Sequence, residues 1–143
     1  MSSNGKPNLD RLAAERAQEV IRRTNQQSPG DVDNLVTKAL GVLQENGIYA
    51  CMLYLLSRTQ DKEKKIAVVV SDEMLNLLAG LGFEGWEKPA IPNPRRRAEV
   101  ILKHISDHVT KDMERLLLAK ETLEQMMIYA RYGAKARKAD EGG

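Results

Sequence analysis

An unbroken apolar run from Ile48 to Leu56 constrains the fold of this chain more than any other stretch. The run is too short to span a bilayer as a helix, which takes about 20 apolar residues. A helix that is apolar all round has no solvent-facing side, so other parts of the chain must cover it. The sequence therefore predicts that the remaining elements pack around this run.

The residues before this run have a one-sided apolar pattern. Apolar residues recur at i, i+3, i+4 and i+7, the spacing of one helical face: Val36, Ala39, Leu40 and Leu43. Asn46-Gly47 follows, and a glycine in the left-handed conformation commonly ends a helix. The same dipeptide is also a strong β-hairpin turn. Because residues 35–43 do not alternate between polar and apolar, the pattern favours helix, tight turn, helix over a hairpin.

Helical spacing predicts two further helices in the first half of the chain. Asn8 can cap one of them, after a disordered lead-in over residues 1–7. The helix that ends in Asn-Gly would be capped by Asp31 or Asp33, whose charge suits the positive end of a helix. Residues 62–81 include β-branched residues typical of a strand. Their apolar positions nevertheless fall on one helical face over several turns, so we expect a helix there too.

The second half is predicted to contain a long connection and two more helices. The connection covers residues 82–93, which are rich in glycine and proline. Asn93-Pro94 then has the cap-and-proline arrangement that starts a helix. The last helix would run from residue 111 to about residue 138, on the order of 40 Å at 1.5 Å per residue. Its end should project from a small domain.

With 143 residues, the chain is long enough for one independently folding domain. The expected fold class is all-α, a compact helical bundle of about six helices with a long C-terminal helix, over residues 8–138. A disordered tail would follow over residues 139–143. The one cysteine, Cys51, excludes an internal disulfide and is expected to be a buried structural thiol. The N-terminus has no signal-peptide pattern, so we expect a cytoplasmic protein.

The sequence carries no catalytic motif. His104 and His108 are four apart on a predicted helix, the spacing that lets two imidazoles bind one metal ion. Ile105 stands where a metalloprotease motif has glutamate, and the region offers no third nitrogen or sulfur ligand, so solvated surface histidines are favoured. No glycine-rich phosphate loop or nucleophile elbow is present. We expect no enzymatic activity, no metal and no cofactor.

The formal net charge is only +2, so any nucleic-acid contact must depend on local clusters of cations. The first turn of a predicted helix contains Arg95, Arg96 and Arg97. The helix dipole disfavours cations there, so one explanation for the three arginines is that they bind a ligand. The alternative is that Arg95 pairs with Glu99 and the other two are only solvated.

A second cluster contains Lys62, Lys64 and Lys65 and is diluted by Asp61 and Glu63. A solvated surface is the favoured interpretation of these lysines.

The last helix carries a third cluster. Arg131, Lys135 and Lys138 are spaced at i, i+4 and i+7 and form one stripe near its end. With the three arginines of the first cluster, they are the candidate RNA-binding residues. The negative end of a helix also favours cations. The helix dipole alone therefore explains the stripe as well as RNA binding does. Tyr129 and Tyr132 flank the stripe and either stack on bases or complete the core.

Phe83 and Trp86 are aromatic residues in the glycine- and proline-rich connection, without helical periodicity. A loop tryptophan either folds back as a lid on the core or anchors a partner surface. We take Phe83 and Trp86 as a candidate protein interface, with the lid as the alternative.

Three segments resemble one protein family. NGIYACMLYLLSR, residues 46–58, is similar to the Asn-Gly-Leu, apolar helix, Ser-Lys segment of the small helical subunit of type III-B (Cmr) CRISPR–Cas effector complexes. ERAQEVI near the start and LAKETLEQMMIYARYGAKA near the end also fit, in the right order. The sequence departs from the family pattern at Ile128, where tryptophan is expected, at Arg58, which replaces lysine, and at Gly133, which replaces alanine.

The resemblance implies a non-catalytic subunit that stacks along the guide–target RNA duplex of a ribonucleoprotein complex in antiviral defence. Its partners would be the backbone and large subunits of the CRISPR effector complex, guide RNA and target RNA, and copies of itself, with no membrane. The family also places a basic residue at Arg131. Two alternatives remain: a helical adaptor that binds only protein, and a small metal-dependent enzyme built on His104 and His108.

Overall fold

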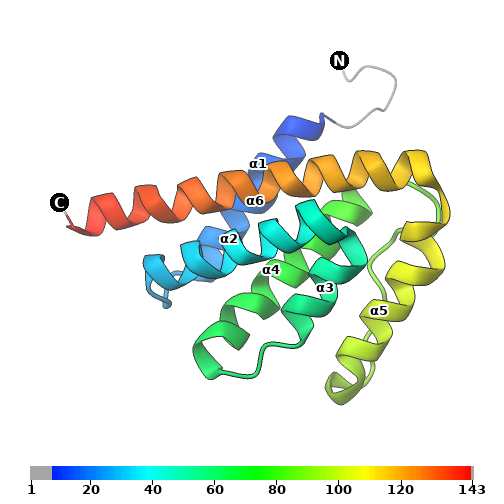
Figure 1. Cartoon of the computed structure of the whole chain (residues 1–143), viewed down its shortest axis with the longest axis horizontal. Coiled ribbons are helices and arrows are strands. Elements are labelled where there is room, and N and C mark those ends of the chain that lie inside the picture. Colours follow the sequence, from blue (N-terminus) through cyan, green and yellow to red (C-terminus); the bar gives the residue numbers. More distant parts are fainter. Residues whose placement is uncertain (1–7, 143) are drawn as a thin grey trace.

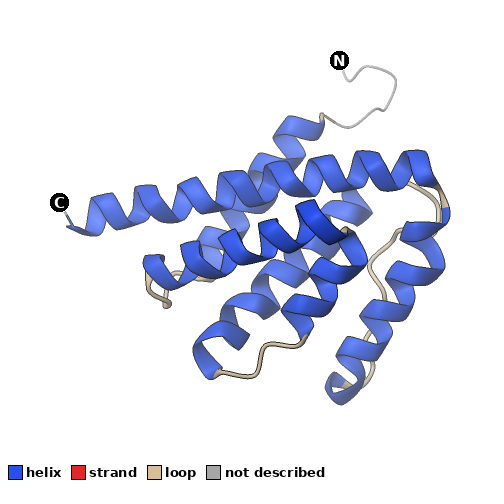
Figure 2. Ribbon diagram, viewed as in Figure 1, coloured by secondary structure: helices blue, strands red, loops and turns tan. Residues whose placement is uncertain are grey.

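The computed structural model describes residues 8–142, which form six α-helices and two short 3₁₀ turns (Figures 1 and 2). The helices are α1 (Leu9–Arg23), α2 (Pro29–Asn46), α3 (Ile48–Leu56), α4 (Asp61–Gly80), α5 (Arg97–His108) and α6 (Met113–Gly142), and the turns are η1 (Pro94–Arg96) and η2 (Val109–Lys111). The described residues contain no strand, so the prediction of an all-α bundle with a long C-terminal helix is confirmed. No helix among them combines the length and the apolar character needed to cross a membrane. The predicted lead-in over residues 1–7 lies outside the described residues.

The helix starts follow from local sequence, with some differences from the prediction. The predicted helix start at Asn93-Pro94 is the 3₁₀ turn η1, so α5 begins at Arg97, and α6 begins at Met113 instead of residue 111. Asn8 caps α1 as expected, because its Oδ1 accepts a hydrogen bond of 3.0 Å from the backbone N–H of Arg11. Helix α2 begins earlier than expected, at Pro29, so Asp31 and Asp33 lie inside the helix and do not cap it. Proline suits the first helical position since it lacks the N–H that would have no partner there.

A single residue, Gly47, separates α2 from α3. Its φ of 97° lies in the region that favours glycine, and its N–H donates to the carbonyl of Leu43 at 3.0 Å. Glycine at this point ends one helix and lets the next begin at once. The predicted order of helix, tight turn, helix is therefore confirmed, and the hairpin is wrong.

Helices α6 and α4 hold the bundle together. Helix α6 crosses the molecule and packs mainly against α1 and α2, whereas α4 contacts α1, α2, α3 and α6 (Figure 1). Helix α3 lies to one side, against α2, α4 and α5. The prediction that the other elements surround α3 was wrong, because a helix of nine residues, about 14 Å long, is too short to touch them all.

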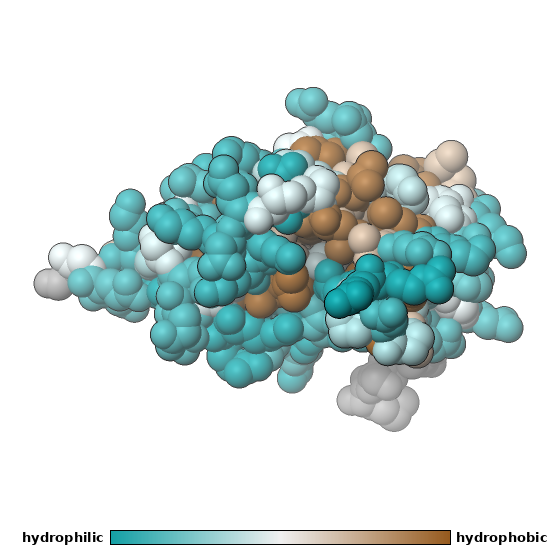
Figure 3. Space-filling view, turned by 90° about the horizontal axis from the view of Figure 1, so that it is seen from below, coloured by the Kyte–Doolittle hydropathy of each residue, from teal (hydrophilic) through white to brown (hydrophobic). Residues whose placement is uncertain are grey.

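Helix α3 is only partly covered. Met52 and Leu55 are buried and Leu56 is half-buried, but Tyr49 and Leu53 are 41% and 47% exposed. The apolar run therefore has a solvent-facing side, contrary to expectation. Figure 3 shows apolar residues gathered on the face of the molecule that is seen from below.

Cys51 is buried in α3, as expected. Its Sγ donates a hydrogen bond to the carbonyl of Ala39 at 3.4 Å, and burial raises the pKa of the thiol to about 12. The thiol is therefore protonated at neutral pH and has a structural place in the core.

Helix α6 continues past its predicted end at residue 138 and stops at Gly142, so residues 139–142 of the predicted tail are helical. Figure 1 shows this end extending beyond α1 and α2. The guanidinium of Arg137 anchors it, because it donates at 2.6–3.0 Å to carbonyl oxygens that follow α1: Thr24, Asn25 and Gln27. The end of a helix leaves such carbonyls without helical partners, so this contact stabilises both helices.

Candidate nucleic-acid interface

Three helix ends meet around a small pocket: the end of α3, the start of α4 and the start of α5 with η1. Its volume is about 190 Å³. Four cations line it: Arg58, Lys64, Arg95 and Arg97. The other lining residues are apolar: Leu55, Leu56, Val68, Pro94 and Ala98. We call this site the basic pocket.

The basic pocket contains no carboxylate. None of its lining residues is acidic, and no described carboxylate lies within 4.0 Å of its four cations. Neighbouring cations are neutralised, since Arg96 pairs with Glu99 at 2.8 Å and Lys65 pairs with Asp61 at 3.4 Å. The predicted pairing of Arg95 with Glu99 was wrong, because Arg96, three residues before Glu99, takes that carboxylate. The pocket therefore keeps its full positive charge.

The structure joins parts of two sequence clusters in this pocket. Arg95 and Arg97 come from the arginine cluster, and Lys64 comes from the lysine cluster. Lys62 lines a different hollow, between α2 and α4, in which Asp31 also lies. Lys64 therefore lines a pocket without acidic residues, and it also lines a neighbouring hollow that Asp61 lines.

Arg97 is half-buried at the edge of the pocket. Burial lowers the pKa of Arg97 below its ordinary value; the attraction of Asp72 opposes this effect and the repulsion of Arg23 adds to it. A cation that loses contact with water and gains no ion pair is unfavourable. An incoming anion would relieve that cost.

Arg58 was not predicted as a site residue. Its guanidinium carbon lies 4.1 Å from the centroid of the Tyr54 ring. Its Nε donates to the carbonyl of Tyr54 at 3.0 Å, and its Nη2 donates to the Oγ of Ser57 at 3.1 Å. These contacts hold a planar cation beside the pocket. The signal in the sequence was the i, i+4 spacing of a tyrosine and an arginine at the end of a helix.

The predicted stripe lies on α6, away from the basic pocket (Figure 1). Asp33 of α2 pairs with two of its members, since the carboxylate lies 3.4 Å from Arg131 Nε and 3.2 Å from Lys135 Nζ. Lys138 is exposed and has no carboxylate partner among the described residues. The stripe is therefore partly neutralised, and the structure does not join it to the arginines at 95–97.

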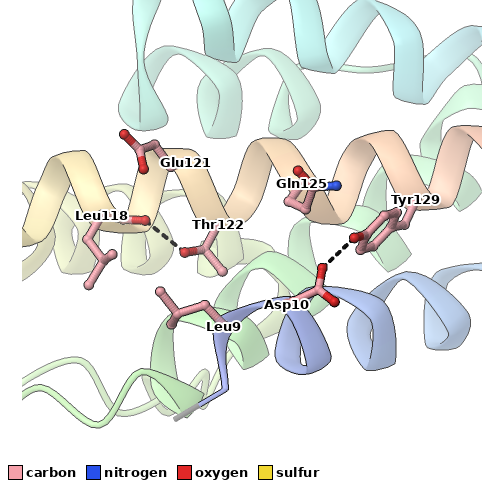
Figure 4. Close-up of a pocket in the computed structure, with 7 residues that line it drawn as sticks. All are labelled: Leu9, Asp10, Leu118, Glu121, Thr122, Gln125 and Tyr129. Atoms are coloured by element: carbon pink, nitrogen blue, oxygen red, sulfur yellow. Dashed lines mark hydrogen bonds between the residues drawn. The ribbon is translucent and has the colours of Figure 1, made fainter. Parts of the chain in front are cut away.

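A second hollow, between α1 and α6, has the opposite charge (Figure 4). Asp10 and Glu121 line it, and the hydroxyl of Tyr129 donates to the carboxylate of Asp10. This hydrogen bond raises the pKa of Tyr129, and burial adds to the effect. The hydroxyl of Tyr129 is thus bonded to Asp10 and its side chain is half-buried, whereas Tyr132 is exposed.

Trp86 folds back onto the core and is only 2% exposed. Its ring meets that of Phe83 edge-on, with centroids 4.9 Å apart, and Arg115 lies 4.7 Å from the Phe83 centroid. The structure therefore agrees with the lid interpretation. A partner cannot reach the buried indole, so Trp86 does not anchor a partner in this arrangement.

His104 is buried, contrary to the prediction that both histidines are solvated. It follows Ile101 by three residues and so shares the buried face of α5. Its ring lies 5.3 Å from that of exposed His108, and its Nε2 has no hydrogen-bond partner among the described residues. No group of three or more metal-ligating side chains gathers in the part of the chain that the structure describes.

The chain matches no protein-family model, no curated protein and no solved structure. The basic pocket and the resemblance of three sequence segments are therefore the grounds for a functional proposal.

Proposed function

We propose that this protein is a non-catalytic, RNA-binding subunit of a type III CRISPR ribonucleoprotein effector complex. The observation that carries the proposal is the basic pocket, in which four cations meet without a carboxylate. Neutralising phosphates with lysine and arginine releases counterions, and this supplies most of the affinity of non-specific binding to nucleic acids. Three guanidiniums offer paired hydrogen bonds to phosphate oxygens, and one ammonium adds a point charge. Such contacts position a protein on RNA and do not read its sequence.

The resemblance supports the same function. The small subunits of that family have no catalytic activity and lie along the guide–target duplex. The proposed partners are accordingly the backbone and large subunits of the complex, guide RNA and target RNA, and further copies of this chain. The basic pocket would contribute to holding RNA within that assembly.

Exposed apolar residues favour a second candidate, a helical adaptor that binds only protein. Large apolar side chains are exposed on α3 and near the start of α6: Tyr49, Leu53, Met113 and Leu117. Apolar surface of this kind often marks contacts between proteins. The adaptor needs no charge in the basic pocket, which separates it from the first candidate.

RNA binding across a salt series tests the proposal. Fluorescence anisotropy of a labelled RNA would compare the parent with a pocket variant, Lys64→Glu/Arg95→Glu, and a control variant, Lys38→Glu/Lys111→Glu. All four side chains are exposed and have no carboxylate partner among the described residues. Both variants therefore change the net charge equally.

The pocket variant should bind RNA more weakly, and the log–log dependence of affinity on salt should become shallower by about 0.7 for each phosphate of a single strand that is no longer neutralised. The control should behave like the parent. Both variants should melt with the parent, because exposed charges contribute little to stability. If the pocket variant binds RNA as well as the control does, alone and assembled with its partners, the protein-only adaptor becomes the better function.

A further inference from the structure

Three of the apolar residues that line the basic pocket are open to solvent, and we call these three the apolar floor. Val68 is 39% exposed, and Pro94 and Ala98 are also exposed. Cations alone would be enough to hold a duplex, which presents its phosphates outward and keeps its bases stacked inside. The apolar floor is covered only if the ligand also brings an apolar surface between its phosphates. An unstacked nucleobase has such a surface.

The volume of the basic pocket matches a single nucleobase or sugar. Its volume of about 190 Å³ lies below the roughly 300–1,000 Å³ of pockets that hold drug-sized molecules. One base or one sugar therefore fills it. The four cations line the same space, so a nucleotide that enters places its adjoining phosphates beside them.

We infer that the basic pocket binds single-stranded RNA by taking one unstacked nucleotide onto its apolar floor and the flanking phosphates onto its four cations. The inference rests on the proposed function and specifies the ligand of the same site. Within the proposed assembly, the pocket therefore takes an unpaired nucleotide of the RNA and not the paired part of the guide–target duplex. A fully paired duplex binds the pocket less well, because it must unpair and unstack a base to cover the floor. The aliphatic floor has no hydrogen-bonding side chains, so it accepts any base.

Arg58 is positioned to take part in this contact. Its guanidinium already lies over the Tyr54 ring at 4.1 Å, and it lines the pocket. Guanidinium planes stack on unpaired bases as well as on aromatic side chains. Because hydrogen bonds to Tyr54 and Ser57 fix it, little side-chain freedom is lost when RNA binds.

Changing the ligand tests the inference without altering the protein. Three labelled ligands of equal length would be compared: a strand without self-complementarity, a strand with the same phosphates in which every base is replaced by an abasic unit, and the duplex of the first strand. The intact strand should bind about five- to tenfold more tightly than the abasic strand, the lower part of the range for one stacked base. It should also bind more tightly than the duplex at physiological salt, where phosphate attraction is screened.

A substitution in the floor provides the second measurement. Val68→Ser should weaken binding of the intact strand severalfold and leave the abasic strand unchanged, which is the coupling expected of a direct contact. Leu117→Ser, at another exposed apolar position, is the matched control and should change neither affinity. Both side chains are exposed, so both variants should melt with the parent.

The outcomes separate the inference from the proposed function. One outcome is that the intact and abasic strands bind the parent equally well and that neither strand binds Lys64→Glu/Arg95→Glu. This outcome would overturn the inference but would leave RNA binding by the pocket standing. RNA binding that survives Lys64→Glu/Arg95→Glu would overturn both. A peptide rich in glutamate and leucine that binds as tightly as the strand, and is lost in the same variant, would assign the pocket to a protein ligand and overturn both as well.

Discussion

Arg97 of α5 donates a hydrogen bond from Nη2 to the Oγ of Ser71 in α4 at 3.0 Å, and this contact ties the two helices beside the basic pocket. The Ser71 hydroxyl in turn donates to the carbonyl of Val68 at 3.0 Å. The guanidinium has no described carboxylate within 4.0 Å, and burial lowers the pKa of Arg97. A half-buried cation whose partner is a hydroxyl contributes little to stability, so the effects of Arg97 on stability and on the proposed RNA binding can be measured separately.

Arg97→Met separates these two roles. Methionine packs in irregular spaces, and it removes a charge that is costly to bury, so the midpoint of thermal unfolding should equal or exceed that of the parent. RNA affinity should fall by about tenfold, since hydrogen bonds to charged groups are worth about 1.5–3 kcal/mol. Thermal melts and anisotropy titrations measure the two effects. A lower midpoint with unchanged RNA affinity would make Arg97 a structural residue.

Two leucines on α3 test which side of this helix faces the core. Leu55 is buried and Leu53 is exposed. Leu55→Ala should cost about 2–5 kcal/mol of unfolding free energy, because it leaves a cavity in a packed core. Leu53→Ala, the same chemical change two residues earlier, should stay within about 0.5 kcal/mol of the parent. Denaturant titrations give both values, and similar losses for the two variants would contradict the packing of α3.

The helices could be predicted because their signals are local. Asn8 and Gly47 act on residues within one turn of themselves, so the start of α1 and the break between α2 and α3 follow from the sequence. The side of α3 that faces the core could not be predicted. An unbroken apolar run has no amphipathic pattern, and nothing within it distinguishes Leu53 from Leu55. That difference depends on where α4 and α5 lie.

The candidate site could be predicted only in part, because it is assembled from distant segments. Arg95 and Arg97 are noticeable as neighbours, but Lys64 and Arg58 join them only when three helix ends meet. Asp33 shows the same limit. It had the sequence features of a helix cap, and its contact with a stripe on α6 depends on tertiary structure.

His104 should make stability depend on pH. Burial lowers the pKa of His104, repulsion from His108 adds to this effect, and Glu87 and Asp107 oppose it. Below about pH 6.5, His104 therefore binds a proton more readily in the unfolded state than in the folded state. The free energy of unfolding should fall as the pH falls below about 6.5 and should recover as the pH rises.

His104→Leu removes the titrating group and keeps an apolar side chain in the core. Its unfolding free energy should vary less than that of the parent between about pH 7 and pH 5. His108→Gln, at the exposed neighbour, should keep most of the pH dependence of the parent. Denaturant titrations at several pH values measure the difference, and parallel curves for His104→Leu and the parent would exclude His104 as the source.

The stripe on α6 is best tested by removing the carboxylate that neutralises it. Replacing Arg131 and Lys135 with glutamate would place three acids together and confuse binding with stability. Asp33→Asn instead keeps the shape and the oxygen that accepts from Thr37 at 3.2 Å, and it frees both cations. The control is Glu19→Gln, which frees the surface residue Arg22 by the same change of charge.

If the stripe binds RNA, Asp33→Asn should raise the affinity and steepen its salt dependence by about 0.7 for each further phosphate of a single strand that the freed cations neutralise. The control should do neither. Anisotropy across a salt series, with the protein alone and assembled with its partners, measures the slope. An unchanged slope for Asp33→Asn, with binding lost in Lys64→Glu/Arg95→Glu, would show that Arg131 and Lys135 serve the contact between α2 and α6. The basic pocket would then be the RNA-binding site without the stripe, since electrostatics at the end of a helix already accounts for its cations.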